Sequence, residues 1–378
     1  MRFSHTFSPL PFLLLLAPLL CGGVCKPTVL GGGPKPERLK LPAGFTVSTF
    51  AEGVRTVRAM AWSPNGILYA GSNDEGCVYA MPDRDGNGRA DTVIVVASGL
   101  QMPVGVAWRE GTLYVSAVSR IVALDDIDAH LDAPPAPRTV YAGFPKETHH
   151  GWKFIAFGPD GHLYVPVGAP CNICLSEDSI FASITRIGTD GSGPEIVAHG
   201  VRNSVGFDWD PRDSSLWFSD NGRDWMGDDM PSCELNRLAK PGQHFGYPFC
   251  HQGDTLDPEF GKGRHCSDFV PPKAKLGPHV APLGMRFYRG GMFPERYRGA
   301  IFIAEHGSWN RSKPIGYRVV VAMPRPDGTV ETEVFAEGWL EGGRAWGRPV
   351  DVQELPDGSL LVSDDAADVI HRITYNAR

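Results

Sequence analysis

The sequence has no run of basic residues and no basic patch interleaved with aromatic side chains. Its 36 Lys and Arg are outnumbered by 43 Asp and Glu, so the formal net charge is −7. Binding to nucleic acid depends on clustered cations that face the phosphate backbone. The composition therefore argues against a nucleic-acid partner.

Several catalytic signatures are also absent. The chain contains no GxSxG, no HExxH and no P-loop sequence, and no GxGxxG follows a predicted strand. These patterns mark a serine nucleophile elbow, a zinc-protease helix, a phosphate-binding loop and a dinucleotide fold. Any reaction must therefore use another arrangement of groups.

Long apolar runs are scarce, and the one that stands out lies near the N-terminus, between Arg2 and Leu20. It is short and broken by proline, which is typical of a secretory signal rather than a membrane span. We expect a signal peptide over residues 1–25 and a linker over residues 26–40. The chain is therefore predicted to be exported, either periplasmic or secreted, with a lipid anchor at Cys21 or Cys25 as the alternative.

Six cysteines remain after the predicted signal, and an even number in an exported chain favours disulfides over metal thiolates. Cys171 and Cys174 form a CxxC without a second CxxC or a histidine pair, which predicts a structural clip of one loop. Cys250 and Cys266 would close a longer loop. Whether Cys77 and Cys233 pair with each other is left open by the sequence.

The main positive feature is a theme of apolar strand, turn and apolar strand that occurs six times. The units are AWSPNGILYA (61–70), AWREGTLYVS (107–116), AFGPDGHLYV (156–165), DWDPRDSSLWFS (208–219), RFYRGGMFPERYRGAIFIA (286–304) and QELPDGSLLVS (353–363). Repeats at this spacing, each with a turn rich in Pro, Asp and Gly, are typical of β-propeller blades. The sequence therefore predicts an all-β, six-bladed β-propeller over residues 41–378.

Alignment of these units on their turns places polar side chains at one position, the start of the innermost strand. The residues at or next to this position are Arg55, Gln101, His150, Arg202 and, one residue after Gly347, Arg348. The ends of the second strands reach the same face and add Asn73, Asp74, Asp220, Asn221, Gly222, Glu305, His306, Asp364 and Asp365. A ring of polar groups over a central funnel is the expected place for a ligand.

The chemistry of this ring indicates a bound cofactor. A neutral imidazole at His150 could take a proton from a hydroxyl group near neutral pH. The planar guanidinium groups of Arg202 and Arg348 are suited to binding the carboxylates of an anionic ligand. A base and arginines without a nucleophile suggest that a cofactor carries the reaction.

At these residues the chain resembles the pyrroloquinoline quinone (PQQ)-dependent glucose/sorbosone dehydrogenase family of soluble six-bladed quinoproteins. The similarity runs from about Leu41 to Tyr375. Its landmarks are PAGF (42–45), HHGWKFIAFGPDGHLYVPVG (149–168), HGVRNSVGFDWDP (199–211), SDNGRD (219–224), ELN (234–236), AEHGSWNR (304–311) and GRPVDVQELPDG (347–358). The forms HGSWNR and GRPVDV look closer to the sorbosone-dehydrogenase-like branch.

The resemblance assigns roles by position. It implies that His150 is the base that removes a sugar hydroxyl proton and that Arg202 lies beside the reactive quinone carbonyl. Cofactor binding is implied for Arg202, Asn203, Arg348, Gly222 and Arg223, the last two through backbone carbonyls that hold a Ca²⁺ ion. Substrate contacts are implied for Gln101, His149 and Trp309.

Three positions depart from the family pattern. An Asp that precedes the catalytic His in the family's glucose enzymes is His149 here, and a second arginine expected two residues after Arg348 is Val350. A lysine expected to bind the cofactor has only Arg311 or Lys313 as a nearby counterpart.

A separate segment, PDRDGNGRAD (82–91), resembles the start of a calcium loop. Asp83, Asp85, Asn87 and Asp91 alternate along it with Gly88 after the third, which gives hard oxygen ligands a spacing that can surround one cation. Position twelve is Ile94 rather than Glu, so a complete EF-hand is excluded. A plain Asp/Gly turn is the other interpretation of this segment.

The sequence thus predicts an exported dehydrogenase that depends on PQQ and Ca²⁺, oxidises a sugar substrate and passes electrons to an external electron acceptor. One alternative is a metal-dependent lactonase, which needs several carboxylates around one axial metal. Asp220, Glu305 and Asp364 could supply them. The other alternative is a propeller that binds a ligand but has lost its cofactor and its activity.

Overall fold

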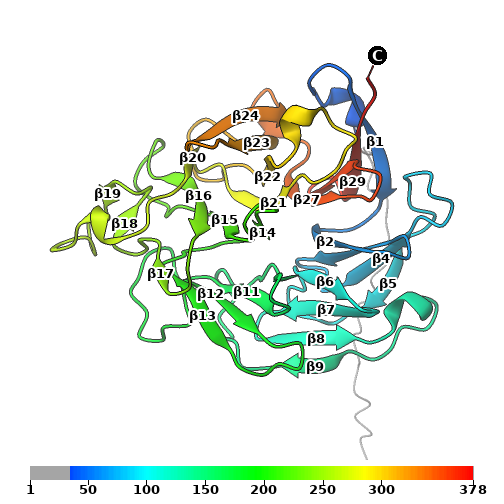
Figure 1. Cartoon of the computed structure of the whole chain (residues 1–378), viewed down its shortest axis with the longest axis horizontal. Coiled ribbons are helices and arrows are strands. Elements are labelled where there is room, and N and C mark those ends of the chain that lie inside the picture. The colour runs from blue at the N-terminus through cyan, green and yellow to red at the C-terminus, as the bar shows by residue number, and fades with distance from the viewer. Residues whose placement is uncertain (1–34, 378) are drawn as a thin grey trace, which may run out of the picture.

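The computed structural model describes residues 35–377, and these form a six-bladed β-propeller, as the repeats predict. The blades surround a central axis, with the chain running once around the circle (Figure 1). Six sheets of four or five strands make up the blades, and two further two-stranded sheets lie outside them. The predicted signal peptide and most of the predicted linker lie outside the described residues.

Each blade is a meander of antiparallel strands, numbered outward from the axis. Blade one contains β2 (Val57–Ser63), β3 (Ile67–Ser72), β4 (Val78–Pro82) and β5 (Ile94–Ala97). Blade two contains β6 (Val106–Arg109), β7 (Thr112–Ala117), β8 (Arg120–Leu124) and β9 (Arg138–Tyr141). Blade three contains β10 (Ala156–Phe157), β11 (Leu163–Val167), β12 (Ser183–Ile187), β13 (Glu195–His199) and the added parallel strand β17 (Gln243–His244).

The remaining blades follow the same plan. Blade four contains β14 (Phe207–Trp209), β15 (Leu216–Asp220), β16 (Ser232–Leu238) and β20 (Ala274–Pro278). Blade five contains β21 (Pro282–Phe287), β22 (Ile301–Glu305), β23 (Arg318–Pro324) and β24 (Val330–Ala336). Blade six contains β27 (Pro349–Glu354), β28 (Leu360–Asp364), β29 (Val369–Tyr375) and β1 (Phe45–Glu52).

Strand β1 closes the ring. It comes from the start of the described chain and pairs antiparallel with β29 near its end, from Phe45 opposite Tyr375 to Glu52 opposite Val369. The two strands lie side by side in Figure 1, blue against red. A closed ring leaves no blade with a missing neighbour, so the sheets on both sides of the closure stay covered.

The core lies between blades rather than inside one layer. Six hydrophobic clusters occupy the six blade interfaces; the cluster between blades five and six, for example, contains Phe302, Val352 and Ile373. Both faces of each sheet are therefore covered, and the second strands β3, β11, β15, β22 and β28 are buried along their whole length. This explains why these strands read as continuous apolar runs instead of alternating patterns.

Serine hydroxyl groups connect alternate pairs of blades near the axis. Ser116, Ser219 and Ser363 come from the second strands of blades two, four and six. Their hydroxyls donate to the carbonyl oxygens of Lys153, Leu283 and Arg58 in the next blade, at 2.7, 2.7 and 2.8 Å. Each bond satisfies a buried carbonyl where neighbouring innermost strands come close.

The other elements are short. The 3₁₀ turns are η1 (Pro36–Arg38), η2 (Ile127–Ala129), η3 (Cys266–Asp268) and η4 (Glu295–Tyr297). One extra hairpin consists of β18 (Cys250–His251) and β19 (Thr255–Leu256), and the other of β25 (Leu340–Glu341) and β26 (Arg344–Ala345). The end of the predicted linker is ordered, since Leu39 is buried in the blade five–six cluster and Lys40 forms a bridge with Glu337. Among residues 35–377, no helix has the length and apolar character needed to cross a membrane.

The predicted disulfides Cys171–Cys174 and Cys250–Cys266 are both present. Cys233 is a buried free thiol, so it does not pair with Cys77.

Candidate active site

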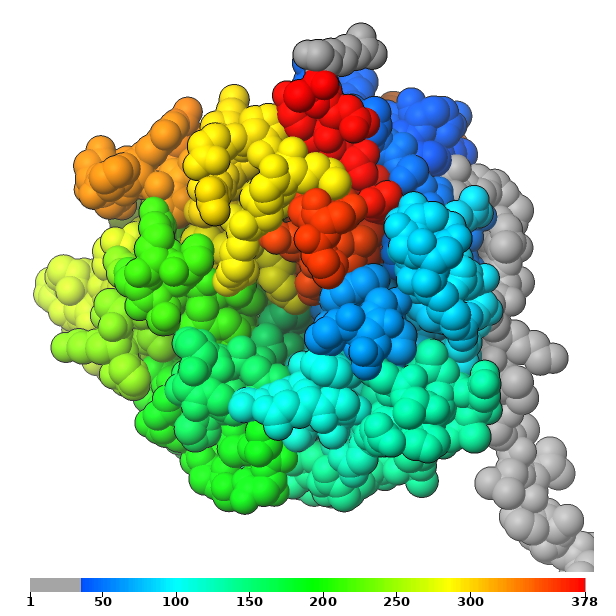
Figure 2. Space-filling view, turned by 45° about the vertical axis from the view of Figure 1, so that its right-hand side comes forward, coloured from blue at the N-terminus to red at the C-terminus, as the bar shows by residue number. Residues whose placement is uncertain are grey.

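A cavity of about 510 Å³ lies where the innermost strands and the ends of the second strands converge, which is the funnel predicted from the repeat. The space-filling surface is hollowed near its centre, where differently coloured blades meet (Figure 2). The polar side chains that line the cavity are Arg58, Asn73, Asp74, His149, His150, Arg202, Asn203, Asn221, Asp224, His279, His306, Asn310, Arg348 and Asp365. The volume is in the range typical of small-molecule sites.

His150 presents one unprotonated ring nitrogen to this cavity. Its Nδ1 lies 2.9 Å from the carbonyl oxygen of Ala169, and because a carbonyl can only accept, Nδ1 carries the proton. Burial, reinforced by Arg202 and His149, holds the pKa of His150 well below its usual value of 6.5. The ring is therefore neutral, and Nε2, which has no hydrogen-bond partner among the described residues, can accept a proton.

The backbone around His150 is built for close packing. His150 itself has a positive φ of 49°, a conformation that few non-glycine residues adopt. A Cβ added at Gly168, at the end of blade three's second strand, would lie 2.6 Å from the His150 Cβ. Only glycine at position 168 leaves room for the imidazole in this place.

Arg202 is held by the disulfide loop. Its side chain is buried, and its Nε and Nη2 donate to the backbone and side-chain oxygens of Asn172 at 2.8 and 2.9 Å. Asn172 lies between Cys171 and Cys174. The loop closed by this disulfide therefore holds the guanidinium group of Arg202 in place. Asp224 adds an ion pair at 3.4 Å, and it also donates its backbone N–H to Asn172.

Two aspartates hold the backbone of Arg202 and Arg348 in place, each by accepting backbone N–H groups with its carboxylate. Asp220 is the last residue of β15, and its carboxylate accepts the N–H groups of Arg202 and Asn203 at 2.9 and 2.7 Å. Asp364 is the last residue of β28, and it accepts the N–H of Arg348 at 2.8 Å. Each aspartate thus joins the end of a second strand to the start of the innermost strand of its own blade.

On the opposite side of the cavity, Arg58, Asp365 and His306 form a chain of charged hydrogen bonds. Asp365 lies 2.8 Å from Arg58 Nη1 and 2.8 Å from His306 Nε2. Both partners favour the carboxylate, so the pKa of Asp365 is lowered in spite of its burial. Arg348 is next to this chain, since its Nε donates to the His306 carbonyl oxygen at 3.1 Å.

The resemblance expects a second arginine at the position that Val350 occupies. Val350 is 2% exposed and packs with Val205, Leu283 and partly buried Trp152 in an apolar plug near the axis. Leu283 and Trp152 also line the cavity, so this plug forms part of its wall. Arg58, from the neighbouring blade, supplies a third arginine to the cavity instead.

The structure brings several predicted residues together and separates others. His149, His150, Arg202, Asn203, Gly222, Trp309 and Arg348 line the cavity. Gln101 does not line it, and Arg55 pairs with Glu75 at 2.6 Å outside it. The Arg223 side chain is buried away from the cavity in an ion pair with Asp257 at 2.6 Å, which leaves only its backbone for a role in the site.

The predicted calcium loop is held by hydrogen bonds within itself. Asp83 accepts the backbone N–H groups of Asn87 and Gly88, Asp85 binds the Asn87 side chain, and Asp91 accepts the N–H of Arg84. Throughout residues 35–377, no group of three or more His, Cys, Asp or Glu side chains is placed to hold a metal ion. The carboxylates of Asp83, Asp85 and Asp91 are therefore not assembled into a cation cluster.

The carboxylates that a lactonase would need are also engaged elsewhere. Asp220 and Asp364 bind backbone N–H groups, and Glu305 pairs with Arg318 at 2.6 Å. Arg311, a candidate for the missing lysine, pairs with Asp229 at 2.8 Å rather than lining the cavity.

Sequence reasoning missed Arg58, Asn172, Asp224, His279 and Asn310. Arg58 lies three residues after Arg55, the residue that turn alignment selected, and is the second residue of β2. Asn172 lies inside the CxxC, and its only sequence signal was its place within a clipped loop. The others come from loops whose course the sequence does not specify.

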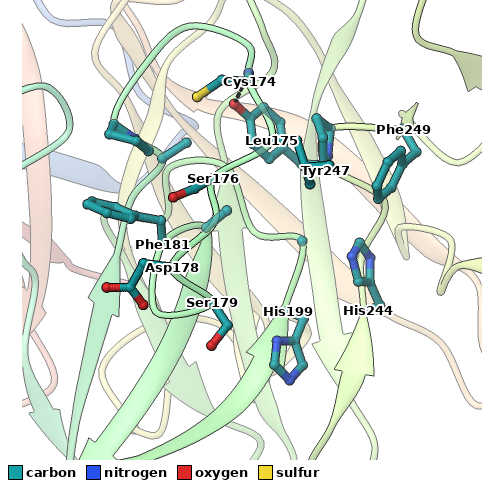
Figure 3. Close-up of a pocket in the computed structure, with 15 residues that line it drawn as sticks. Cys174, Leu175, Ser176, Asp178, Ser179, Phe181, His199, His244, Tyr247 and Phe249 are labelled. Atoms are coloured by element: carbon teal, nitrogen blue, oxygen red, sulfur yellow. Dashed lines mark hydrogen bonds between the residues drawn. The ribbon is translucent and has the colours of Figure 1, made fainter. Parts of the chain in front are cut away.

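A second, smaller pocket of about 210 Å³ includes Cys174 of the disulfide loop in its wall. Its wall includes Leu175, Phe181, His199, His244 and Phe249. Figure 3 shows the Tyr247 hydroxyl next to Cys174, whose backbone N–H it accepts at 3.0 Å. The loop that holds Arg202 therefore also forms part of the wall of this pocket.

Comparison with known proteins is consistent with this geometry. The TrAA12-like family model matches residues 39–338. The chain belongs to the TrAA12-like family. The resemblance to soluble six-bladed quinoproteins is thereby confirmed at the level of family and fold.

Among curated relatives, an uncharacterized protein of Borreliella burgdorferi is 32% identical over 354 residues, covering 89% of this chain and 91% of the relative. The pyrroloquinoline quinone-dependent pyranose dehydrogenase of Coprinopsis cinerea is 23% identical over 346 residues. That match covers 77% of this chain and 46% of the relative, so the chain spans less than half of that enzyme's length.

Solved structures show the same fold. The holo form of the PQQ domain of pyranose dehydrogenase from Coprinopsis cinerea superposes with a TM-score of 0.76 at 21% identity, covering 91% of this chain and 99% of that one. The PQQ-bound aldose sugar dehydrogenase of Streptomyces coelicolor gives 0.64 at 22% identity, covering 89% and 100%.

Proposed function

We propose that this chain is an exported quinoprotein that uses PQQ to oxidise a hydroxyl group of a sugar and passes the electrons to an external acceptor. One observation carries the proposal: the free Nε2 of His150 opens into the same cavity as the guanidinium groups of Arg58, Arg202 and Arg348. The named activities of relatives in the family support the chemistry.

The cavity fits a planar anion with several carboxylates, which is what PQQ is. Three arginines line it, and guanidinium groups bind carboxylates through paired donors. The side-chain amide of Asn203 faces the same space and makes no hydrogen bond with the described residues, so it is free to bind a ligand. We assign Arg58, Arg202, Arg348 and Asn203 to cofactor binding.

When bound, PQQ would supply an electrophilic quinone that accepts hydride from a sugar carbon. The role of this chain is to remove the proton and to orient the groups. His150 accepts the hydroxyl proton at Nε2, while Nδ1–H stays on the Ala169 carbonyl and fixes the ring. Arg202, held by Asn172 and Asp220, places positive charge next to the site where negative charge develops.

A Ca²⁺ ion is part of the proposal through backbone oxygens. Gly222 lines the cavity, and no hydrogen bond from the described residues reaches the carbonyl oxygens of Gly222 or Arg223. Two unpaired carbonyls suit a hard cation that takes further oxygen ligands from a bound molecule. His149 and Trp309, which also line the cavity, are assigned to the substrate.

The test is reconstitution. PQQ and Ca²⁺ are added to the purified protein, and dye reduction is followed with a panel of aldoses and sorbosone. We expect sugar-dependent dye reduction that requires PQQ. Lactone hydrolysis without PQQ, or full activity in His150→Ala, would contradict the proposal.

A further inference from the structure

Two tryptophans stand exposed at the rim of the cavity. Trp225 is 70% and Trp309 is 68% exposed, and they are the two aromatic residues among the large exposed hydrophobic side chains of residues 35–377. Their rings touch edge to face, with centroids 5.6 Å apart and an interplanar angle of 87°. Trp309 also lines the cavity, so the pair continues the cavity wall onto the outer surface.

The backbone of Trp225 has a conformation that large side chains disfavour. Its φ is +70°, a conformation that is rare for bulky residues and is found mainly where a function requires it. Burial does not compensate for this strain, because most of the indole is in water. An exposed, strained aromatic next to a candidate active site indicates a binding role.

The two loops that carry the tryptophans are braced against each other. Asn310 Nδ2 donates to Asp224 Oδ1 at 2.6 Å, directly beside both rings in the sequence. Arg311 adds bonds to the Asp228 carbonyl oxygen at 3.0 Å and to Asp229 at 2.8 Å. The rings therefore sit on a fixed support, which reduces the entropy lost when a ligand binds.

The same support connects the rings to the reaction centre. Asp224 pairs with Arg202 on one side and with Asn310 on the other. Asn310 and Asp224 also both line the cavity, so polar groups lie directly beside Trp309. Exposed apolar ring faces next to a polar cavity suit a ligand that has both C–H faces and hydroxyl groups.

We propose that Trp225 and Trp309 form a platform for a carbohydrate chain whose terminal unit enters the cavity. The substrate class is then an oligosaccharide or the end of a glycan rather than a free monosaccharide, an inference that rests on the proposed function. The pyranose units next to the terminal one stack on the indole rings through their C–H faces.

Other occupants fit the surface less well. Two aromatic side chains give far less area than the roughly 800 Å² per partner that a stable protein interface buries. The neighbouring Asp224, Asp228 and Asp229 and the net charge of −7 oppose an anionic lipid surface. A neutral polyhydroxy chain meets neither objection.

The test measures binding without the cofactor. Cellohexaose, maltohexaose, xylohexaose and chitohexaose are titrated into PQQ-free protein by calorimetry, next to the matching monosaccharides. We expect at least one hexaose to bind about tenfold or more tightly than its monosaccharide, with Trp225→Ala and Trp309→Ala each weakening it about tenfold. Trp225→Phe should retain part of the affinity because it keeps an aromatic face.

Leu256→Ala is the matched control, since Leu256 is 43% exposed but lies on the hairpin β18–β19. It should bind the hexaose like the unchanged protein, and thermal melting of every variant confirms folding. The platform is overturned if no hexaose binds more tightly than its monosaccharide, or if folded Trp225→Ala binds it unchanged. Binding of PQQ, measured separately, decides the proposed function, so either claim can fail alone.

Discussion

His150 and Arg202 are joined through the backbone of one residue. The carbonyl oxygen of Ala169 accepts Nδ1–H of His150 at 2.9 Å, and the N–H of Ala169 donates to the carbonyl oxygen of Arg202 at 2.8 Å. The proposed base and the proposed electrostatic group, which come from neighbouring blades, thus share one peptide support. A fixed support of this kind keeps both groups in place before a substrate arrives.

The role of His150 is tested by His150→Ala. Loss of the proton acceptor should lower kcat by about 10²- to 10⁴-fold, the range typical of general-base catalysis. Affinity for PQQ should change little, because the arginines remain. Steady-state dye reduction and a PQQ titration measure the two effects, and His130→Ala, a surface histidine, is the control. Equal losses of kcat and PQQ affinity would indicate a structural role instead.

The pH dependence of the reaction follows from the lowered pKa of His150. A base must be unprotonated, and burial keeps this imidazole neutral at pH values where an ordinary histidine is charged. Between pH 7.5 and 5.5, kcat/KM should therefore stay nearly constant, whereas a base with a pKa of 6.5 would lose about tenfold. A pH profile that breaks at 6.5 would contradict the assignment.

The same lowered pKa affects folding. Protonation of His150 is easier in the unfolded chain, so its contribution to stability is present above pH 6.5 and is lost as the pH falls below that value.

The two disulfides should have different effects when removed. Cys171→Ser with Cys174→Ser loosens the loop whose Asn172 holds Arg202, so PQQ affinity should fall about tenfold or more, as for a lost charged hydrogen bond. Stability should change little, because this loop closes over a separation of only 3 residues.

Cys250→Ser with Cys266→Ser is the matched control. This bond spans 16 residues, so its loss should lower the free energy of unfolding by about 3 kcal/mol while PQQ affinity is retained. Calorimetric melting and PQQ titration of both double variants make the comparison. If the Cys171 and Cys174 variant binds PQQ like the unchanged protein, the loop does not position Arg202.

Because the pKa of Glu234 is raised, the folded protein should lose stability as the pH rises. Glu234 faces Asp220 across β15 and β16, and burial, with the nearby Asp220 charge, raises the pKa of Glu234 to about 8. The folded protein therefore keeps a proton that the unfolded chain releases near pH 4.5, and stability falls between pH 4.5 and 8.

Glu234→Gln has no proton to lose. At each pH, the free energy of unfolding of the unchanged protein is subtracted from that of Glu234→Gln. This difference should be larger at pH 8 than at pH 5 by more than about 1.4 kcal/mol, which corresponds to one pKa unit. Urea unfolding at several pH values measures this, with the exposed Glu110→Gln as control. A difference that is the same at pH 5 and pH 8 would show that Glu234 is ionised throughout.

The sequence was sufficient to predict the propeller and the main cavity residues because both depend on a repeat. Turns rich in Pro, Asp and Gly define each unit, so alignment on them places His150, Arg202 and Arg348 at one level of the ring. The CxxC and the Cys250–Cys266 pair followed from counting cysteines in a chain predicted to be exported.

What the sequence did not reveal depends on contacts between blades and between loops. Asn172 acquires its role only because the clipped loop reaches across to Arg202 in the next blade. Arg58 reaches the cavity from the second residue of β2, three residues beyond the position that the alignment of turns selects. The bracing of Asn310 against Asp224 joins loops of two blades and leaves no periodic trace in either.

The central claim is that the cavity binds PQQ, and a titration of PQQ-free protein with PQQ in the presence of Ca²⁺ tests it most directly. The account predicts a saturable change in absorbance at one PQQ per chain with a Kd of about 10 μM or lower, weakened at least tenfold in Arg202→Ala with Arg348→Ala. Absence of a saturable change up to about 100 μM PQQ would contradict it.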